Sequence, residues 1–187
     1  MQYPNTIETA RLLLRPWRER DAAALYALAK DPRIGPAAGW PAHTSAENSA
    51  EIIRTVLSAP GTYAVTLRGD DAAIGSIGFK PTTSEVGRGH LEIGYWVGAP
   101  FWGNGYIPEA VRALLALGFG PLGLTEIWCA HYADNHKSHR VIKKCGFTFR
   151  YACTEDVPLL HERREVWYYA ITAEQWRQQG GLAHGAL

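Results

Sequence analysis

The chain has 187 residues, of which 47% are hydrophobic and 20% charged, and its formal net charge is +1 at pH 7. This composition is typical of a single globular domain, which we place over residues 1–187. A nucleic-acid-binding protein would show a basic excess on one face, and the densest basic stretch, Arg11, Arg15, Arg18 and Arg20, is interpreted as surface charge. Because the charge is nearly balanced, we expect no nucleic-acid binding. The sequence has neither a basic-then-apolar leader nor an apolar run of about 18 residues, so we expect no membrane span.

Strands and helices alternate in the N-terminal part of the chain. A first strand is predicted over residues 11–17 and a helix over residues 21–30. Residues 36–43, rich in Gly, Pro and Ala, are predicted to form a loop, and Thr44 and Glu47 are predicted to form the capping box of a second helix. The apolar stripe of that helix is expected to consist of Ile52, Ile53, Val56 and Leu57.

Three strands then follow, with expected ranges Thr62–Arg68, Ala73–Phe79 and Leu91–Val97. In the third of these strands, successive side chains should point to opposite faces of the sheet. One face would carry Leu91, Ile93, Tyr95 and Val97. The other face would carry Glu92, Gly94 and Trp96.

The second half begins with a glycine-rich loop over residues 98–105 and a helix behind it. The next elements are expected to be a strand, a helix and a hairpin of two strands, over Glu126–Tyr132, Asn135–Cys145, Phe147–Thr154 and Glu162–Ile171. A short helix should start at the capping pattern Thr172–Gln175, and residues from about 180 should form a tail. This order predicts an α/β (α+β) fold with a mixed sheet and helices on both faces. Neither glycine-rich nucleotide fingerprint occurs.

Residues 102–110, Trp-Gly-Asn-Gly-Tyr-Ile-Pro-Glu-Ala, have the composition of a phosphate-binding turn. Gly103 and Gly105 allow the backbone to approach a ligand closely, and Pro108 suits the first turn of a helix. Free amides and the positive end of the helix dipole would then converge on a phosphate or pyrophosphate. A tight glycine turn before a helix is also a common structural feature, so this segment alone leaves both interpretations open.

A second segment runs from Asp134 to Phe147 and starts with Asp-Asn-His-Lys-Ser. Asn135 is predicted to be the N-cap of the helix that follows. Ser138 falls in the first turn, where helix amides could orient its hydroxyl. A serine in that position is usually a capping or surface residue, so this segment alone does not indicate catalysis.

In combination, three motifs resemble those of the GNAT superfamily of N-acetyltransferases. They are Leu91-Glu-Ile-Gly-Tyr-Trp-Val97, Trp102-Gly-x-Gly-Tyr-Ile-x-Glu-Ala110 and Asn135-x-x-Ser-x-x-Val-Ile-x-Lys-Cys-Gly-Phe147. With its opening and closing segments, the sequence is similar to the RimJ/RimL-like branch, whose members acetylate N-terminal alanine or serine of ribosomal proteins. The resemblance covers a core of about residues 7–178 and implies a mostly antiparallel sheet. It also implies that the sheet splays between its fourth and fifth strands, 91–97 and 126–132.

The resemblance implies acetyl-CoA as cosubstrate. The pantetheine arm would enter the splay, with the acyl carbonyl near the backbone amides of Tyr95, Trp96 and Val97. The pyrophosphate would lie on the amides of Gly103, Asn104, Gly105, Tyr106 and Ile107. Two loop residues depart from the family pattern, because Trp102 replaces Gln or Arg and Ile107 replaces Gly or Ala; the Ile107 side chain must therefore point away from the phosphates. Arg140 is the expected contact of the CoA 3′-phosphate, whereas Lys143 and Lys144 are interpreted as helix-surface charges.

Acyl transfer requires a neutral amine, donors for the oxyanion and a proton source for the departing thiolate. The resemblance places Ser138 near the CoA sulfur and gives Asn135 a supporting role. Glu92 is the candidate base acting through water, with a carboxylate on a solvated sheet face as the equal alternative. His131 and Tyr132, at the end of the opposite strand, are rival candidates, although a histidine at a strand end is more often structural.

The segment containing Trp40 and His43 lies where this family builds its acceptor pocket, and these two residues would either contact the substrate or anchor the loop. Residues 36–43 contain no carboxylate, which argues mildly against a polycationic acceptor. We therefore expect an acetyl-CoA-dependent N-acetyltransferase in which a primary amine attacks directly, with a peptide N-terminus as the first acceptor. The alternatives are an acetyltransferase for a small amine (an aminoglycoside or polyamine) and a non-catalytic CoA-binding module.

The three cysteines, Cys129, Cys145 and Cys153, have no metal-ligand spacing and no disulfide framework. We expect free and mostly buried thiols, no metal and a cytoplasmic location. Cys129 lies in an apolar strand and is not expected to act as a nucleophile. The oligomeric state is expected to be a monomer or a homodimer.

Overall fold

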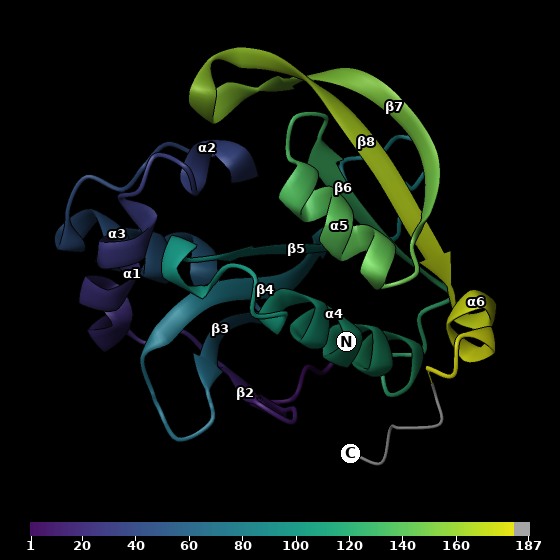
Figure 1. The fold of residues 1–187 in the computed structure, drawn as a ribbon, viewed down its shortest axis with the longest axis horizontal. Coiled ribbons are helices and arrows are strands. Elements are labelled where there is room, and N and C mark those ends of the chain that lie inside the picture. The colour runs from purple at the N-terminus through teal and green to yellow at the C-terminus, as the bar shows by residue number, and fades with distance from the viewer. Residues whose placement is uncertain (182–187) are drawn as a thin grey trace.

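The computed structural model describes residues 1–181 as one sheet of eight strands with helices on both faces (Figure 1). The strands are β1 (Ile7–Glu8), β2 (Leu12–Arg15), β3 (Thr62–Leu67), β4 (Ala73–Pro81), β5 (Leu91–Val97), β6 (Glu126–Tyr132), β7 (Thr148–Val157) and β8 (Glu162–Thr172). Their order in the sheet is β1-β2-β3-β4-β5-β6-β8-β7, and only β5 and β6 run parallel. The expected fold class is confirmed.

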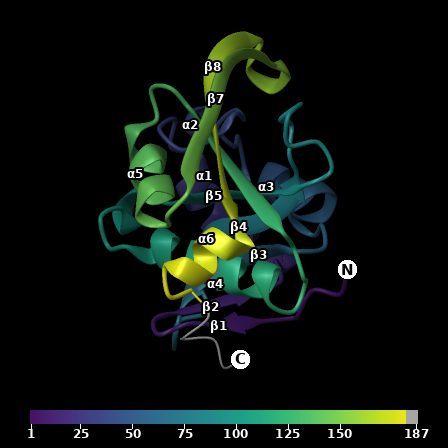
Figure 2. The ribbon, with the colours of Figure 1, turned by 90° about the vertical axis from the view of Figure 1, so that its right-hand side faces the viewer.

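The helices differ in length and position. They are α1 (Ala22–Ala29), α2 (Gly35–Ala38), α3 (Ala46–Ile52), α4 (Tyr106–Phe119), α5 (His136–Lys144) and α6 (Ala173–Gln178). A π-helical turn, Ile53–Leu57, continues α3. In Figure 2 the long β7–β8 hairpin rises above the rest of the sheet, and Figure 1 shows its tip near α2.

Two apolar clusters hold the helices against opposite faces of the sheet. Leu114 of α4 and Ile142 of α5 belong to the larger cluster, together with alternate residues of the strands. Leu25 of α1 and Ile53 belong to the cluster on the other face. Since full burial of such a side chain contributes about 1.5–3 kcal/mol, the clusters fix the helices on the sheet. The predicted alternation in β5 is confirmed, because Ile93 packs in the first cluster and Trp96 against the second.

The parallel strands β5 and β6 pair at one end only. The paired residues are Leu91 with Ile127 and Glu92 with Trp128. Each strand has seven residues, so the remainder of β5 and β6 diverges. β6 instead pairs along its whole length with β8. The expected splay is therefore present; these strands are the fifth and sixth because the two-residue β1 was not predicted.

Three local predictions for the first half were wrong. The predicted loop over 36–43 begins inside a short helix, α2, which Gly39 ends at a positive φ of 91°. The N-cap of α3 is Ser45, one residue later than predicted, and its hydroxyl accepts a hydrogen bond from the backbone N–H of Asn48. Val56 is 58% exposed because the π-helical turn rotates it out of the expected apolar stripe.

Arg15 is a further correction, because it is buried rather than part of the surface charge. Its guanidinium donates to both carboxylate oxygens of Asp21 at 2.8 Å and to Asp71 at 2.7 Å. The aspartates lower the cost of burying the guanidinium and raise its pKa. Arg18 and Arg20 pair with the same Asp71 at the surface. Arg15, Arg18 and Arg20 thus share one ion-pair network, whereas Arg11 pairs separately with Glu109.

The second half agrees closely with the sequence prediction. Asn135 caps α5, Gly146 follows that helix at a φ of 81°, and β7 pairs with β8 as a hairpin. All three cysteines are free, and two of them are buried. None of the helices within residues 1–181 has the length and apolar character required to span a membrane. The predicted tail lies largely outside the described residues, which end at 181.

Candidate active site

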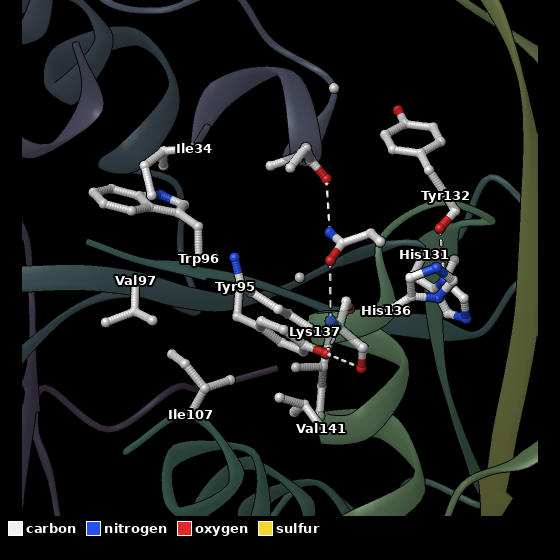
Figure 3. Close-up of a pocket in the computed structure, with 18 of the residues that line it drawn as sticks. Ile34, Tyr95, Trp96, Val97, Ile107, His131, Tyr132, His136, Lys137 and Val141 are labelled. Carbon is white, nitrogen blue, oxygen red and sulfur yellow. Dashed lines mark hydrogen bonds between the residues drawn. The ribbon is translucent and has the colours of Figure 1, made fainter. Parts of the chain in front are cut away.

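A pocket of about 850 Å³ opens where β5 and β6 diverge (Figure 3). It passes through the sheet, because its wall includes residues from both faces of β5. Tyr95 points towards α5, whereas Trp96 points to the opposite side and lies near Ile34 (Figure 3). We call the Tyr95 side the α4–α5 half and the Trp96 side the α2 half. Two ligands could therefore meet inside the splay from opposite faces.

The loop before α4 forms one wall of the α4–α5 half. Gly103 and Gly105 have φ values of 82° and 78°, which L side chains rarely adopt. No atom lies within 4 Å of a Cβ built at Gly103, so space remains above the loop. Gly105 is the N-cap of α4 and no side chain caps this helix, so its first amides remain available to an anion.

The pyrophosphate residues expected from the sequence line this wall, with one exception. Gly103, Gly105, Tyr106 and Ile107 border the pocket, whereas Asn104 does not. The Asn104 amide group donates to the carbonyls of Phe101 and Trp102 and thereby stiffens the loop. Ile107 is 5% exposed and packs in the main core, which agrees with the requirement that its side chain leave the loop amides open.

Two cationic side chains, Lys137 and Arg33, lie over the Trp102 ring at the wall of the pocket. The Trp102 indole N–H donates to the Val97 carbonyl at 2.9 Å, which fixes the ring. The Lys137 ammonium lies 3.4 Å and the Arg33 guanidinium 5.4 Å from the ring centroid. Arg33 is also paired with Asp31. Lys137 forms no ion pair within residues 1–181, and it borders the pocket beside the glycine loop, so its charge is available to a phosphate.

The α5 helix brings a pair of hydroxyls to the splay. The Tyr95 hydroxyl lies 2.8 Å from the Ser138 hydroxyl, and burial raises the pKa of Tyr95 well above its ordinary value. Asn135 Oδ1 accepts from the Ser138 amide at 3.0 Å, while Asn135 Nδ2 donates to the Ala37 carbonyl of α2 at 3.0 Å. Asn135 therefore ties the helix that carries Ser138 to α2.

Backbone direction decides which β5 amides face the splay. The Ile93 carbonyl accepts from the Cys129 thiol, and the Val97 carbonyl accepts from the Trp102 indole. The backbone polar groups of Ile93 and Val97 therefore point away from β4. The amide and carbonyl of one residue point to the same side in an antiparallel ladder, and the side alternates along the strand. The amides of Tyr95 and Val97 therefore face the splay, whereas the Trp96 amide faces β4. Trp96 contributes its side chain to the pocket instead.

Glu92 lies in the α2 half and is 4% exposed, so the solvated alternative considered for it is wrong. Its two oxygens are held by Lys80 Nζ at 3.0 Å and by the Thr82 hydroxyl at 3.0 Å. Desolvation lowers the pKa of Lys80, but the Glu92 carboxylate outweighs this effect and raises it. The carboxylate is thus fixed in position and charge-balanced.

The structure brings two other predicted acceptor residues together outside the pocket wall. Trp40 packs against Trp96, with ring centroids 5.9 Å apart, and His43 packs against Trp40. His43 Nδ1 lies 2.8 Å from the Ser49 hydroxyl, and burial lowers its pKa. This geometry favours the anchoring interpretation of both residues.

His131 and Tyr132, the rival candidates for the base, differ in placement. His131 borders the pocket, and its ring stacks on His139 and on Tyr169, with centroids 5.2 Å and 5.5 Å away. Its Nδ1 lies 2.7 Å from the Tyr132 carbonyl, and burial lowers its pKa. These contacts favour a structural role for His131. Tyr132 borders the α2 half beside Gly39.

The basic residues of α5 differ in whether they border the pocket. Arg140 borders the pocket, as expected, and so does Lys144, which we interpreted as a surface charge. Lys143 does not border it. Sequence reasoning missed Lys137 and the Tyr95 hydroxyl. Their partners, Trp102 and Ser138, lie 35 and 43 residues away along the chain, so no local pattern predicts either contact. Within residues 1–181, no group of three or more His, Cys, Asp or Glu residues is arranged to hold a metal.

Comparisons with known proteins indicate an acetyltransferase. A family model described as an acetyltransferase (GNAT) domain matches residues 11–148. The uncharacterized N-acetyltransferase YnaD of Bacillus subtilis is 31% identical over 171 residues, which cover 91% of this chain and 98% of that protein. The FsC-acetyl coenzyme A-N(2)-transacetylase of Aspergillus fumigatus is 26% identical over 91% of this chain and 77% of that protein. The crystal structure of a GNAT-family acetyltransferase from Bacillus anthracis matches with a TM-score of 0.79 and 25% identity, over 90% of this chain and 99% of that chain.

Proposed function

The chain belongs to the GNAT acetyltransferase family, and we propose that it transfers the acetyl group of acetyl-CoA to a primary amine within a ternary complex. The observation that carries the proposal is the splay between β5 and β6, where the α4–α5 half of the pocket meets the α2 half. The finer placement in the RimJ/RimL-like branch is part of the proposal, and it makes a peptide N-terminus one acceptor to test.

Acetyl-CoA would supply the activated acetyl group, and the α4–α5 half has the chemistry to hold it. The uncapped N-terminus of α4 and the open space at Gly103 suit a pyrophosphate, which needs several amide donors in one place. Lys137 and Arg140 add positive charge to the same half. Phosphate contact through backbone amides tolerates the unusual Trp102.

Donors for the reacting carbonyl and the departing sulfur would come from both sides of the splay. The amides of Tyr95 and Val97 face it and are held in place by the sheet, so they need no reorganisation when negative charge develops on the carbonyl oxygen. Ser138 is the candidate donor to the sulfur. Its hydroxyl can donate in that direction while it accepts from the Tyr95 hydroxyl, which burial keeps protonated.

Glu92 is the candidate base for the acceptor. An amine attacks a thioester only in its neutral form, so its ammonium form must first lose a proton. A water molecule would relay that proton to the Glu92 carboxylate. Lys80 and Thr82 hold that carboxylate on the α2 half. A covalent acetyl-protein intermediate is disfavoured, because burial raises the pKa of Cys129, and that of Cys145 to about 11, which leaves both thiols protonated near neutral pH.

Thiol release from acetyl-CoA, measured against a panel of peptide N-termini and small amines, tests the proposal. Wild type should release thiol only when an acceptor is present, and Ser138→Ala should lower kcat by about 100-fold, the lower end of the usual range of about 10²- to 10⁴-fold for one acid–base group. Lys143→Gln is the matched surface control, since Lys143 lies outside the pocket wall. Tight CoA binding by calorimetry without acceptor-dependent release would instead indicate a non-catalytic CoA-binding module.

A further inference from the structure

Glu155 is a carboxylate in the wall of the α2 half that the transfer chemistry above does not use. It lies on β7 and is partly buried. Its Oε1 accepts from the Tyr168 hydroxyl at 2.7 Å and from the Cys153 thiol at 3.3 Å. Within residues 1–181 it forms no ion pair, whereas the adjacent Asp156 pairs with Arg163. The Glu155 carboxylate is therefore available to pair with a cationic group of a ligand.

Arg164 is one candidate cation for Glu155, because the two residues are opposite each other in the β7–β8 register. Its guanidinium is directed elsewhere. It pairs with Glu162 at 2.6 Å, donates to the Pro36 carbonyl at 2.7 Å and lies over the Tyr132 ring. Arg164 therefore holds α2 against the hairpin, and its charge is already matched by Glu162.

A short chain of side chains links Glu155 to the candidate base. The Thr83 hydroxyl lies 2.7 Å from the Tyr168 hydroxyl, which donates to Glu155. The neighbouring Thr82 donates to Glu92. Two adjacent threonines thus place both carboxylates on one wall of the α2 half. Since Lys80 balances Glu92, this wall retains one negative charge, at Glu155.

The reacting amine cannot provide the missing positive charge, because it is neutral when it attacks. A second ammonium group on the same molecule can. The pocket wall also includes apolar side chains that would suit a methylene spacer, namely Ile34, Trp96, Val157, Leu159 and Val166. The α2 helix is tied to the hairpin through Arg164 and to α5 through Asn135, and this favours a compact acceptor over a polypeptide.

We propose that the acceptor is a small amine carrying a second ammonium group, and that Glu155 binds that group while Glu92 serves the reacting amine. This inference rests on the acetyl transfer proposed above. It assigns Glu155 as a specificity-determining residue that is contributed by the β7–β8 hairpin and not by residues 36–43.

The test compares linear alkyl diamines, alkyl monoamines of equal chain length and peptide N-termini, using thiol release with wild type and Glu155→Gln. A charge-assisted hydrogen bond of the usual strength predicts that wild type prefers diamines over monoamines by about 10- to 100-fold in kcat/KM. Glu155→Gln should remove most of that preference by raising KM for diamines, while kcat changes little. Gln can still accept from Tyr168, so the fold should be kept. Glu165→Gln, on the same hairpin but outside the pocket wall, is the charge-matched control and should retain the preference.

Three results would each overturn the inference while leaving acetyl transfer intact. The first is equal kcat/KM for monoamines and diamines in wild type. The second is an equal loss of kcat/KM for both classes in Glu155→Gln. The third is a higher kcat/KM for peptide N-termini than for every diamine. Absence of release with all three classes contradicts the proposed function itself.

Discussion

Asn135 links two parts of the site, and its replacement separates their contributions. Its Oδ1 caps α5 at the Ser138 amide, and its Nδ2 donates to Ala37 of α2. Loss of an N-cap costs about 1 kcal/mol, and loss of a partly exposed hydrogen bond costs about 0.5–1 kcal/mol. Asn135→Ala should therefore lower the free energy of unfolding by about 1.5–2 kcal/mol. Asn135→Ser keeps a capping oxygen and should lower it by about 0.5–1 kcal/mol.

The kinetic expectation for the same variants differs from the stability expectation. Both variants lose the bond to α2, so both should lower kcat/KM for the acceptor, by about two- to fivefold if about 0.5–1 kcal/mol of positioning is lost. Urea titrations followed by circular dichroism give the stability, and thiol release gives the kinetics. If Asn135→Ser restores wild-type kcat/KM while Asn135→Ala does not, the link to α2 has no role and this reasoning is refuted.

Three further predictions concern the hydroxyl pair, the buried ion pair and pH. Tyr95→Phe should lower kcat by about five- to tenfold without changing the Kd for CoA by calorimetry, because it removes only the partner of the Ser138 hydroxyl; an unchanged kcat would contradict that role. Arg15→Met leaves Asp21 buried without its partner and should cost about 3–5 kcal/mol in urea unfolding, so a loss below about 1 kcal/mol would exclude a contribution from the buried pair. Burial lowers the pKa of His43 and His131 below 6.5, so below pH 6.5 the unfolded chain binds protons that the folded chain does not, and stability should fall from about pH 7 to about pH 5.5. His131→Gln should reduce that slope, and equal slopes would show that His131 titrates normally in the fold.

Much of the fold follows from local sequence patterns. The period of two in β5 assigns Ile93 and Trp96 to opposite faces, and the structure agrees because each face packs against its own helices. Asn135 followed by an apolar stripe identifies the start of α5, since the cap is a contact within one turn. These features need only neighbours in the sequence, which is why pattern alone predicts them.

The features that were missed depend on contacts between distant segments. Arg15 lies in a charged stretch, but Asp21 and Asp71 draw it into the interior. For Trp40 and His43 the sequence left substrate contact and loop anchoring open, and only their packing on Trp96 and Ser49 favours anchoring. No spacing rule in one sequence specifies which distant side chain will be the partner.

The roles in the site divide in the same way. Ser138 became a candidate through its motif, whereas the hydroxyl of its partner Tyr95, 43 residues away, had no predicted role, since only the Tyr95 backbone amide had been placed near the acyl carbonyl. Glu155 had no motif at all, because its position in the pocket depends on the register of β7 against β8. The α2 half of the pocket is built from such long-range contacts, so it could not be predicted in detail.

The central claim is direct acetyl transfer from acetyl-CoA to an amine inside the splay. Its most direct test is one turnover with stoichiometric acetyl-CoA and a diamine acceptor, followed by mass spectrometry of both the acceptor and the intact protein. We predict one acetyl group on an acceptor nitrogen, none on the protein at any time point, and a strongly slowed transfer in Ser138→Ala. An acetylated protein that forms before the product, or an acceptor that gains no acetyl group while thiol is released, would contradict the account.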